Sequence, residues 1–99
     1  MDKGQEKTIV GIGWYKKEDW DLLLINSDDR QNMHDNFDDW EKDTNKRFQE
    51  LLIAGINVKK IQISVYELIA WCKENKLKIN GSSKAKYIAF RTHQIYENE

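Results

Sequence analysis

The sequence predicts a small, mostly helical α+β domain with a minimal two-stranded sheet and one long central helix. Two short apolar runs alternate as strands do, a long stripe of apolar residues repeats at helical spacing, and capping signals precede the later segments. The predicted order is strand, helix, long helix, strand, helix, helix. With 99 residues, of which 39% are hydrophobic, we expect one domain over residues 1–99, with residues 1–7 and 97–99 as frayed tails.

The first strand is predicted at residues 9–15. Val10, Ile12 and Trp14 fall on one face of it and Gly11 and Gly13 on the other, because side chains alternate along a strand. Two glycines on one face let a helix approach the backbone closely. A G-x-G phosphate loop is disfavoured, because the third glycine is missing and Trp14 stands where a helix should open. A short helix follows at residues 16–25.

A long helix is predicted from a cap at residues 26–28 to Gly55, a residue type that commonly ends helices. Its apolar stripe keeps the spacing of one helical face. The stripe consists of Met33, Phe37, Trp40, Thr44, Phe48, Leu51 and Leu52.

The second strand is predicted at residues 58–63. Ser64, followed three residues later by Glu67, forms a capping-box pattern that opens the next helix. After an extended loop and a turn at residues 80–83, a last helix runs to Tyr96. Its expected inward residues are Ala85, Ile88, Ala89, Thr92 and Ile95. Two strands alone are marginal, so they pair under the helices or extend into a larger sheet across a homodimer, and both remain open.

Charge is sorted along the chain behind a near-neutral total of −1. Residues 18–43 carry ten acids against two bases, and residues 59–91 carry eight bases against two acids. Such asymmetry indicates interaction surfaces. The acidic part predicts either a solvated helix exterior or a docking site for a basic partner. The residues of that docking site would be Asp28, Asp35, Asp38, Asp39 and Asp43.

The basic C-terminal third is the second candidate surface. The segment from Val65 to Ile88, V-Y-E-L-I-A-W-C-K-E-N-K-L-K-I-N-G-S-S-K-A-K-Y-I, resembles the SAP motif, a helix–extended loop–helix module. It departs from that motif by one extra residue between Gly81 and Lys84, and by Lys76 in the place of a glycine. The resemblance implies DNA binding through Lys78, Ser82, Ser83, Lys84 and Lys86.

Residue spacing adds Tyr87 and Arg91 to this predicted anion-binding surface, because they follow Lys84 along one side of a helix. The whole chain is also similar to small bacterial proteins that begin with G-x-G-W-Y and contain a W-C-K/R segment, and that resemblance implies no function.

Signatures of catalysis and of metal binding are weak. His34 precedes Asp38 and Glu41 on one helical face, but clustered His and Cys ligands are missing. Cys72, the single cysteine, continues a core stripe and is expected to be a buried structural residue. We expect no cofactor. A lone cysteine and the lack of an apolar leader or of a membrane-length apolar run predict a cytoplasmic protein without a membrane partner.

We therefore expect a non-catalytic binding module that docks a protein or self-associates through charged surfaces. Nucleic-acid binding through the basic C-terminal third is the alternative. A small enzyme or metal-binding domain that uses His34 and His93 is the second alternative.

Overall fold

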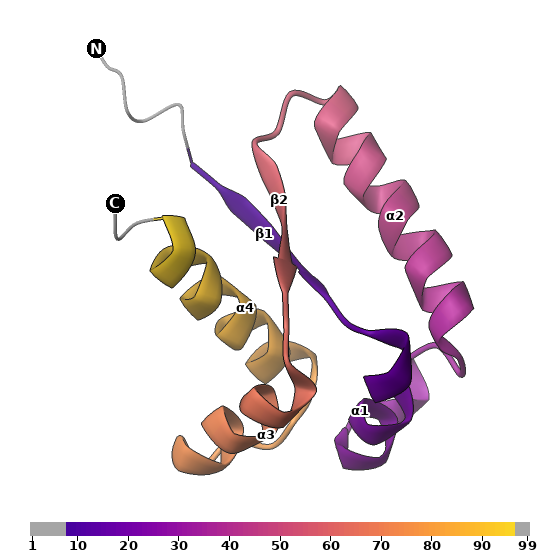
Figure 1. Cartoon of the computed structure of the whole chain (residues 1–99), viewed down its shortest axis with the longest axis vertical. Helices are drawn as coiled ribbons and strands as arrows, with labels where there is room; N and C mark the ends of the chain where they lie inside the picture. The colour runs from indigo at the N-terminus through magenta and orange to yellow at the C-terminus, as the bar shows by residue number, and fades with distance from the viewer. Residues whose placement is uncertain (1–7, 97–99) are drawn as a thin grey trace.

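The computed structural model describes residues 8–96 of the chain, and the two predicted tails lie outside this range. The fold is a small, mostly helical α+β arrangement in the predicted order of strands and helices (Figure 1). Its elements are β1 (Val10–Trp14), α1 (Trp20–Asn26), α2 (Phe37–Ile53), β2 (Val58–Gln62), α3 (Val65–Glu74) and α4 (Gly81–Tyr96), with short 3-10 turns at Lys17–Asp19 and Arg30–Asn32.

The two strands form a parallel sheet, paired from Val10 opposite Val58 to Trp14 opposite Gln62. The chain crosses from β1 to β2 through α1 and α2, as parallel pairing requires. Helices α2 and α4 stand on opposite sides of the strands, and α1 and α3 lie together at one end (Figure 1). None of the helices within residues 8–96 combines the length and the hydrophobicity that a membrane-spanning segment needs.

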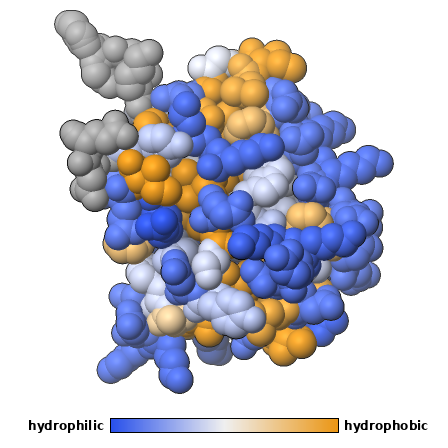
Figure 2. Space-filling model, viewed as in Figure 1, coloured by the Kyte–Doolittle hydropathy of each residue, from blue (hydrophilic) through white to orange (hydrophobic). Residues whose placement is uncertain are grey.

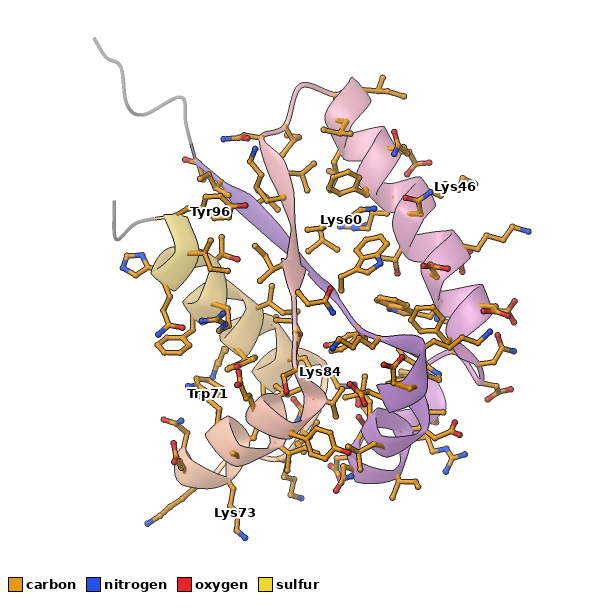
Figure 3. The ribbon with its side chains drawn as sticks, in the orientation of Figure 1. Lys46, Lys60, Trp71, Lys73, Lys84 and Tyr96 are labelled. Atoms are coloured by element: carbon orange, nitrogen blue, oxygen red, sulfur yellow. The ribbon has the colours of Figure 1, made fainter. Side chains whose placement is uncertain are left out.

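The glycine face of β1 receives α4, as the sequence predicts. A Cβ atom added at Gly11 would overlap the Thr92 hydroxyl, and one at Gly13 would press on the Ile88 side chain. The opposite face packs on α2 through the Trp14 ring, which lies 5.5 Å edge-on from the Trp40 ring. The Lys60 ammonium covers Trp14 at 4.1 Å, so this strand lysine lies between β2 and α2 (Figure 3).

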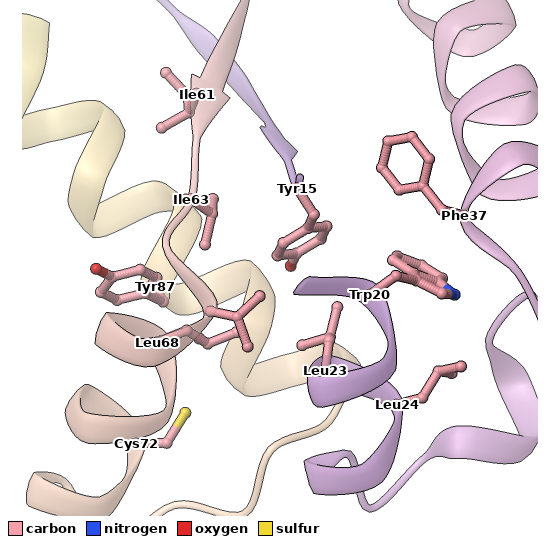
Figure 4. Close-up of a cluster of buried hydrophobic side chains, with 11 residues drawn as sticks. Tyr15, Trp20, Leu23, Leu24, Phe37, Ile61, Ile63, Leu68, Cys72 and Tyr87 are labelled. Atoms are coloured by element: carbon pink, nitrogen blue, oxygen red, sulfur yellow. The ribbon is translucent and has the colours of Figure 1, made fainter. Parts of the chain in front are cut away.

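The hydrophobic core sits where α1 and α3 meet the carboxyl ends of the strands (Figure 4). Its most completely buried side chains are Leu23, Ile61, Ile63, Val65, Leu68 and Cys72. Cys72 is a free, fully buried thiol, which confirms the burial predicted for it.

The central helix exists but is shorter than predicted, because it begins at Phe37 rather than near residue 28. Asn36 is its N-cap, and the Asn36 side chain accepts a hydrogen bond of 2.9 Å from the Asp39 N–H. Met33 adopts an extended backbone before it. The Met33 side chain instead contacts α4, with its Sδ atom 3.1 Å from Lys84 Nζ. A tertiary contact therefore breaks the helix that periodicity alone extends.

Both later helices begin at the predicted caps. The Glu67 N–H donates to the Ser64 hydroxyl at 3.3 Å. At α4, the Ser83 N–H donates to Asn80 Oδ1 at 3.0 Å, and the Asn80 N–H donates back to the Ser83 hydroxyl at 2.9 Å. This reciprocal pair is a capping box with serine in the place of glutamate, and it fixes where α4 starts beside β1.

Candidate binding groove at the free edge of the sheet

One edge of β1 has no strand beside it within residues 8–96. On the other edge, the Val10 N–H donates to the Asn57 carbonyl at 3.0 Å, and the Ile63 N–H donates to the Trp14 carbonyl at 2.9 Å. Successive residues of a strand direct their backbone groups to opposite edges. The N–H and C=O groups of Gly11 and Gly13 therefore point away from β2, toward the open edge.

That open edge lies in a cavity of about 860 Å³, which we call the groove. Its base is residues 9–13. Its walls are one face of α2, with Trp40, Thr44, Arg47 and Leu51, and one face of α4, with Lys84, Ala85, Ala89 and His93. Cavities of this size are typical of ligand sites, and two rigid helices hold the strand edge between them.

The walls of the groove include residues that the sequence predicts to be buried. Ala85, Ala89 and Ile95 are exposed, whereas the inward-facing residues of α4 include Tyr87 and Ser83. The prediction of inward residues is thus wrong for these three residues of α4 and correct for Thr92, which is buried, and for Ile88, which is half-buried. Within residues 8–96, these residues of α4 therefore keep the spacing of a buried helical face but remain exposed.

The stripe of α2 is also covered only in part. Phe37 is buried, and Leu51 is half-buried in the wall of the groove. Leu52 is 45% exposed and Ile53 86% exposed, and Figure 2 shows apolar surface at the end of the molecule where α2 meets β2.

The charge of the groove is one-sided. None of its lining residues is an Asp or a Glu, whereas His34, Arg47, Lys84 and His93 all line it. Two of these bases already contact acids outside the lining. Lys84 Nζ lies 3.2 Å from Asp29 Oδ1, with both side chains largely buried, and His34 Nε2 lies 2.7 Å from Asp43 Oδ2.

Tyr15 and Trp20 also line the groove, and both are buried. Burial raises the pKa of the Tyr15 phenol above its ordinary value, and the nearby Asp29 and Cys72 raise it further. The phenol is therefore neutral at physiological pH. Trp20 Nε1 has no hydrogen-bond acceptor in the described part of the chain.

The predicted nucleic-acid residues do not form one accessible surface. Ser83 and Tyr87 are buried, and Lys84 is held by Asp29 in the groove. Lys78, Ser82 and Lys86 are exposed, and Arg91 is half-buried, with its guanidinium 2.6 Å from Gln94 Oε1. The accessible remainder is a smaller cationic patch around the start of α4.

The predicted acidic docking residues all lie on the surface. Asp28, Asp35, Asp38, Asp39 and Asp43 are exposed. Asp38 pairs with Lys17 at 3.3 Å. The acidic and basic segments of the sequence meet through the Lys84–Asp29 pair, whereas the exposed aspartates of α2 stay free of the basic third in the described residues.

The two histidines line the same groove but stand far apart. His34 follows Met33, which contacts Lys84, and His93 lies nine residues after Lys84 on α4. Nine helical residues span roughly 13 Å, so the histidines do not form one site. Within residues 8–96, no group of three His, Cys, Asp or Glu side chains could hold a metal ion.

Sequence reasoning missed the groove, although two signals for it were present. The paired glycines mark the face of β1 on which a helix lies, and the long apolar helical stripes contrast with only two predicted strands. Neither pattern identifies which of the two outer strand edges lies in a cavity, because that depends on how the helices pack around the sheet. Comparison of the chain with protein-family models, with curated proteins and with solved structures finds no match.

Proposed function

We propose that this chain is a non-catalytic protein-interaction module that binds an extended segment of another chain as a third strand at the free edge of β1. The observation that carries the proposal is the unpaired edge of β1 inside the groove between α2 and α4. A bound peptide would pair its backbone with Gly11 and Gly13 and place alternate side chains against the two helical walls.

The burial of Gly13 favours a strand over other ligands. Gly13 is buried, yet its N–H and C=O point away from β2. Buried backbone groups need hydrogen-bond partners, and a peptide backbone offers one donor and one acceptor at the spacing that a strand edge requires. An acyl chain or a flat aromatic ligand would fill the apolar walls but would leave these groups unpaired.

Catalysis is less well supported. His34 and Asp43 form a hydrogen-bonded pair beside the groove. The hydroxyl of Thr92, which also lines the groove, donates to the Ile88 carbonyl rather than to a base. A nucleophile activated by a neighbouring base is the usual signature of covalent catalysis, and the described contacts of His34 do not include one.

Nucleic-acid binding is the second candidate, and it is favoured by the exposed Lys78, Ser82 and Lys86 around the start of α4. It predicts binding of a fluorescent DNA duplex that weakens steeply as salt rises. Loss of that binding in the K78E/K86E double variant would support it. No binding by micromolar protein at low salt would rule it out.

A selection of random octapeptides displayed on phage tests the main proposal. Peptides that bind the wild-type protein should shift the backbone amide resonances of Gly11 and Gly13 in ¹H–¹⁵N spectra. They should also bind the Ala89→Trp variant about tenfold or more weakly, since the indole would fill the groove.

Ala70→Trp is the matched control, because Ala70 is an exposed helical alanine that does not line the groove. Thermal unfolding checks that both variants fold. Failure to select any peptide would overturn the proposal. So would peptides that leave the Gly11 and Gly13 amides unchanged, or that bind the Ala89→Trp variant as well as the wild type.

A further inference from the structure

We propose that the segment bound in the groove is acidic: an extended peptide of another protein that carries carboxylate side chains. This inference rests on the proposed function, because it names the chemistry of the strand that β1 accepts. It follows from how the charges of the groove are arranged and from which of them are already paired.

The groove lining contains four basic residues and no acid, and two of these bases, Lys84 and His34, already pair with acids outside the lining. Arg47 is the clearest element, since it is exposed on α2, lines the groove, and makes no ion pair with the other described residues. A guanidinium beside an apolar wall pairs well with a carboxylate, which it can hold through two parallel hydrogen bonds.

Lys84 marks the other end of the groove. Its ammonium lies between Asp29 Oδ1 at 3.2 Å and Met33 Sδ at 3.1 Å, and its side chain is 12% exposed. Asp29 and Met33 Sδ account for two of the three donors of this ammonium group, which leaves one donor. A carboxylate on the peptide could therefore share this lysine, with His34 nearby on the adjoining wall.

The two basic positions suit one extended chain. Lys84 contacts the segment that leads into α2, and Arg47 lies ten residues after the first residue of that helix. Ten helical residues span roughly 15 Å, and an extended chain covers that distance in about four to five residues. An octapeptide is therefore long enough to run along this length of α2.

A second copy of this chain is a poorer occupant on charge grounds. Residues 9–15, which would supply the pairing strand, contain no acid, and α4 contains none either. Pairing two β1 edges would bring two acid-free, basic groove linings together. Residues 1–7 of the same chain, MDKGQEK, are also a poorer occupant. Their two acids are balanced by two lysines, and Met1 is their only large apolar residue.

The octapeptides selected against the wild-type protein supply the test. Those that shift the Gly11 and Gly13 amides should be enriched in Asp and Glu over the starting library. In fluorescence anisotropy, Arg47→Glu should weaken an acidic peptide about tenfold. Replacing the acidic residue of the peptide near Arg47 by Lys should restore affinity for Arg47→Glu and weaken binding to the wild type.

Lys46→Glu is the matched control. It changes the net charge by the same amount at the neighbouring exposed residue of α2, which does not line the groove, and it should change the affinity little. Peptides that bind the β1 edge without acidic enrichment, or without a charge swap at position 47, would overturn this inference and leave the proposed function standing. Peptides that bind elsewhere would overturn both.

Sedimentation velocity of the free protein tests whether a second copy of the chain occupies the groove instead. We expect a monomer at micromolar concentration. A dimer that the Ala89→Trp substitution dissociates, and that the Ala70→Trp control leaves intact, would place a second copy in the groove and would overturn the acidic-peptide inference.

Discussion

Apolar residues at helical spacing occur both where α1 and α3 meet the strands, which we call the closed end, and in the groove between α2 and α4, but only those of the closed end are fully buried. At the closed end, Leu68 of α3 and Leu23 of α1 are almost completely buried. In the groove, Leu51 of α2 is half-buried and Ala89 of α4 is exposed, although each continues an apolar stripe. The closed end is filled because α1 and α3 converge on the carboxyl ends of both strands (Figure 4).

The open groove exists because the sheet stops at two strands. Helices α2 and α4 cover opposite faces of the sheet, and nothing in the described chain occupies the space beside β1 that a third strand would fill. Helical periodicity thus predicts which helix faces are apolar. The number of strands in the sheet decides whether those faces are buried. Stability measurements on matched residues of the two regions test this contrast.

The largest expected effect is at the closed end. Leu68→Ala removes a side chain that is 1% exposed, and we expect a loss of about 2–5 kcal/mol in the free energy of unfolding, because a cavity remains. Leu51→Ala in the groove should cost about 1 kcal/mol or less, since that side chain is only partly removed from water. Urea denaturation measures both. Equal losses would mean that the groove wall is packed like the core.

The contact between β1 and α4 comes next. Gly11→Ala should destabilise the fold by about 1–3 kcal/mol, because the added Cβ meets the Thr92 side chain. Thr92→Ala removes the hydroxyl that a Cβ at Gly11 would overlap.

A double-mutant cycle tests the cause of that loss. The Gly11→Ala/Thr92→Ala variant should recover part of the loss, so that the two substitutions are less damaging together than their separate costs imply. Additive costs would place the strain of Gly11→Ala somewhere other than Thr92. Either result shows how firmly the α4 wall of the groove is fixed.

The sequence was sufficient for the parts of the fold that local chemistry determines. The helix starts at Ser64 and at Asn80 follow from side chains that cap nearby backbone groups, and both are present. The glycine face of β1 also predicts its helix contact. The start of α2 could not be predicted, because Met33 leaves the helical stripe for a contact with Lys84, fifty-one residues later.

The sequence predicts some residues of the candidate site but not how they are arranged. Lys84 was singled out as a cationic residue, but its pairing with Asp29 depends on a long-range contact that no local spacing encodes. No pattern in the sequence distinguishes Arg47 from the other exposed basic residues of α2. Its place in the lining of the groove depends on how α2 packs beside β1, which is a long-range contact.

The stability lost on breaking an ion pair should differ less between a largely buried pair and an exposed pair than the loss differs between Leu68→Ala and Leu51→Ala. Lys84→Met leaves the Asp29 carboxylate without its partner in a largely buried position, and we expect a cost of about 1–2 kcal/mol. Lys17→Met breaks the exposed pair with Asp38 and should cost about 0.5 kcal/mol or less. Adding Asp29→Asn to Lys84→Met should recover stability. If both single variants cost the same, the Lys84 pair is no more protected from solvent than a surface pair.

The smallest effect appears only at alkaline pH and concerns Tyr15, at the boundary between the closed end and the groove. Burial raises its pKa in the folded protein, so the unfolded chain loses the phenol proton first, near the ordinary tyrosine pKa of about 10. Stability from the neutral phenol is therefore fully present below that pH and is lost as pH rises toward the folded pKa.

Urea denaturation between neutral and alkaline pH should show a shallower alkaline decline in Tyr15→Phe than in the wild type. Tyr66→Phe, at an exposed position, should follow the wild-type curve. If Tyr15→Phe declines as steeply as the wild type, the phenol reaches water through the groove, and the boundary that separates the packed end from the open one lies deeper than Tyr15.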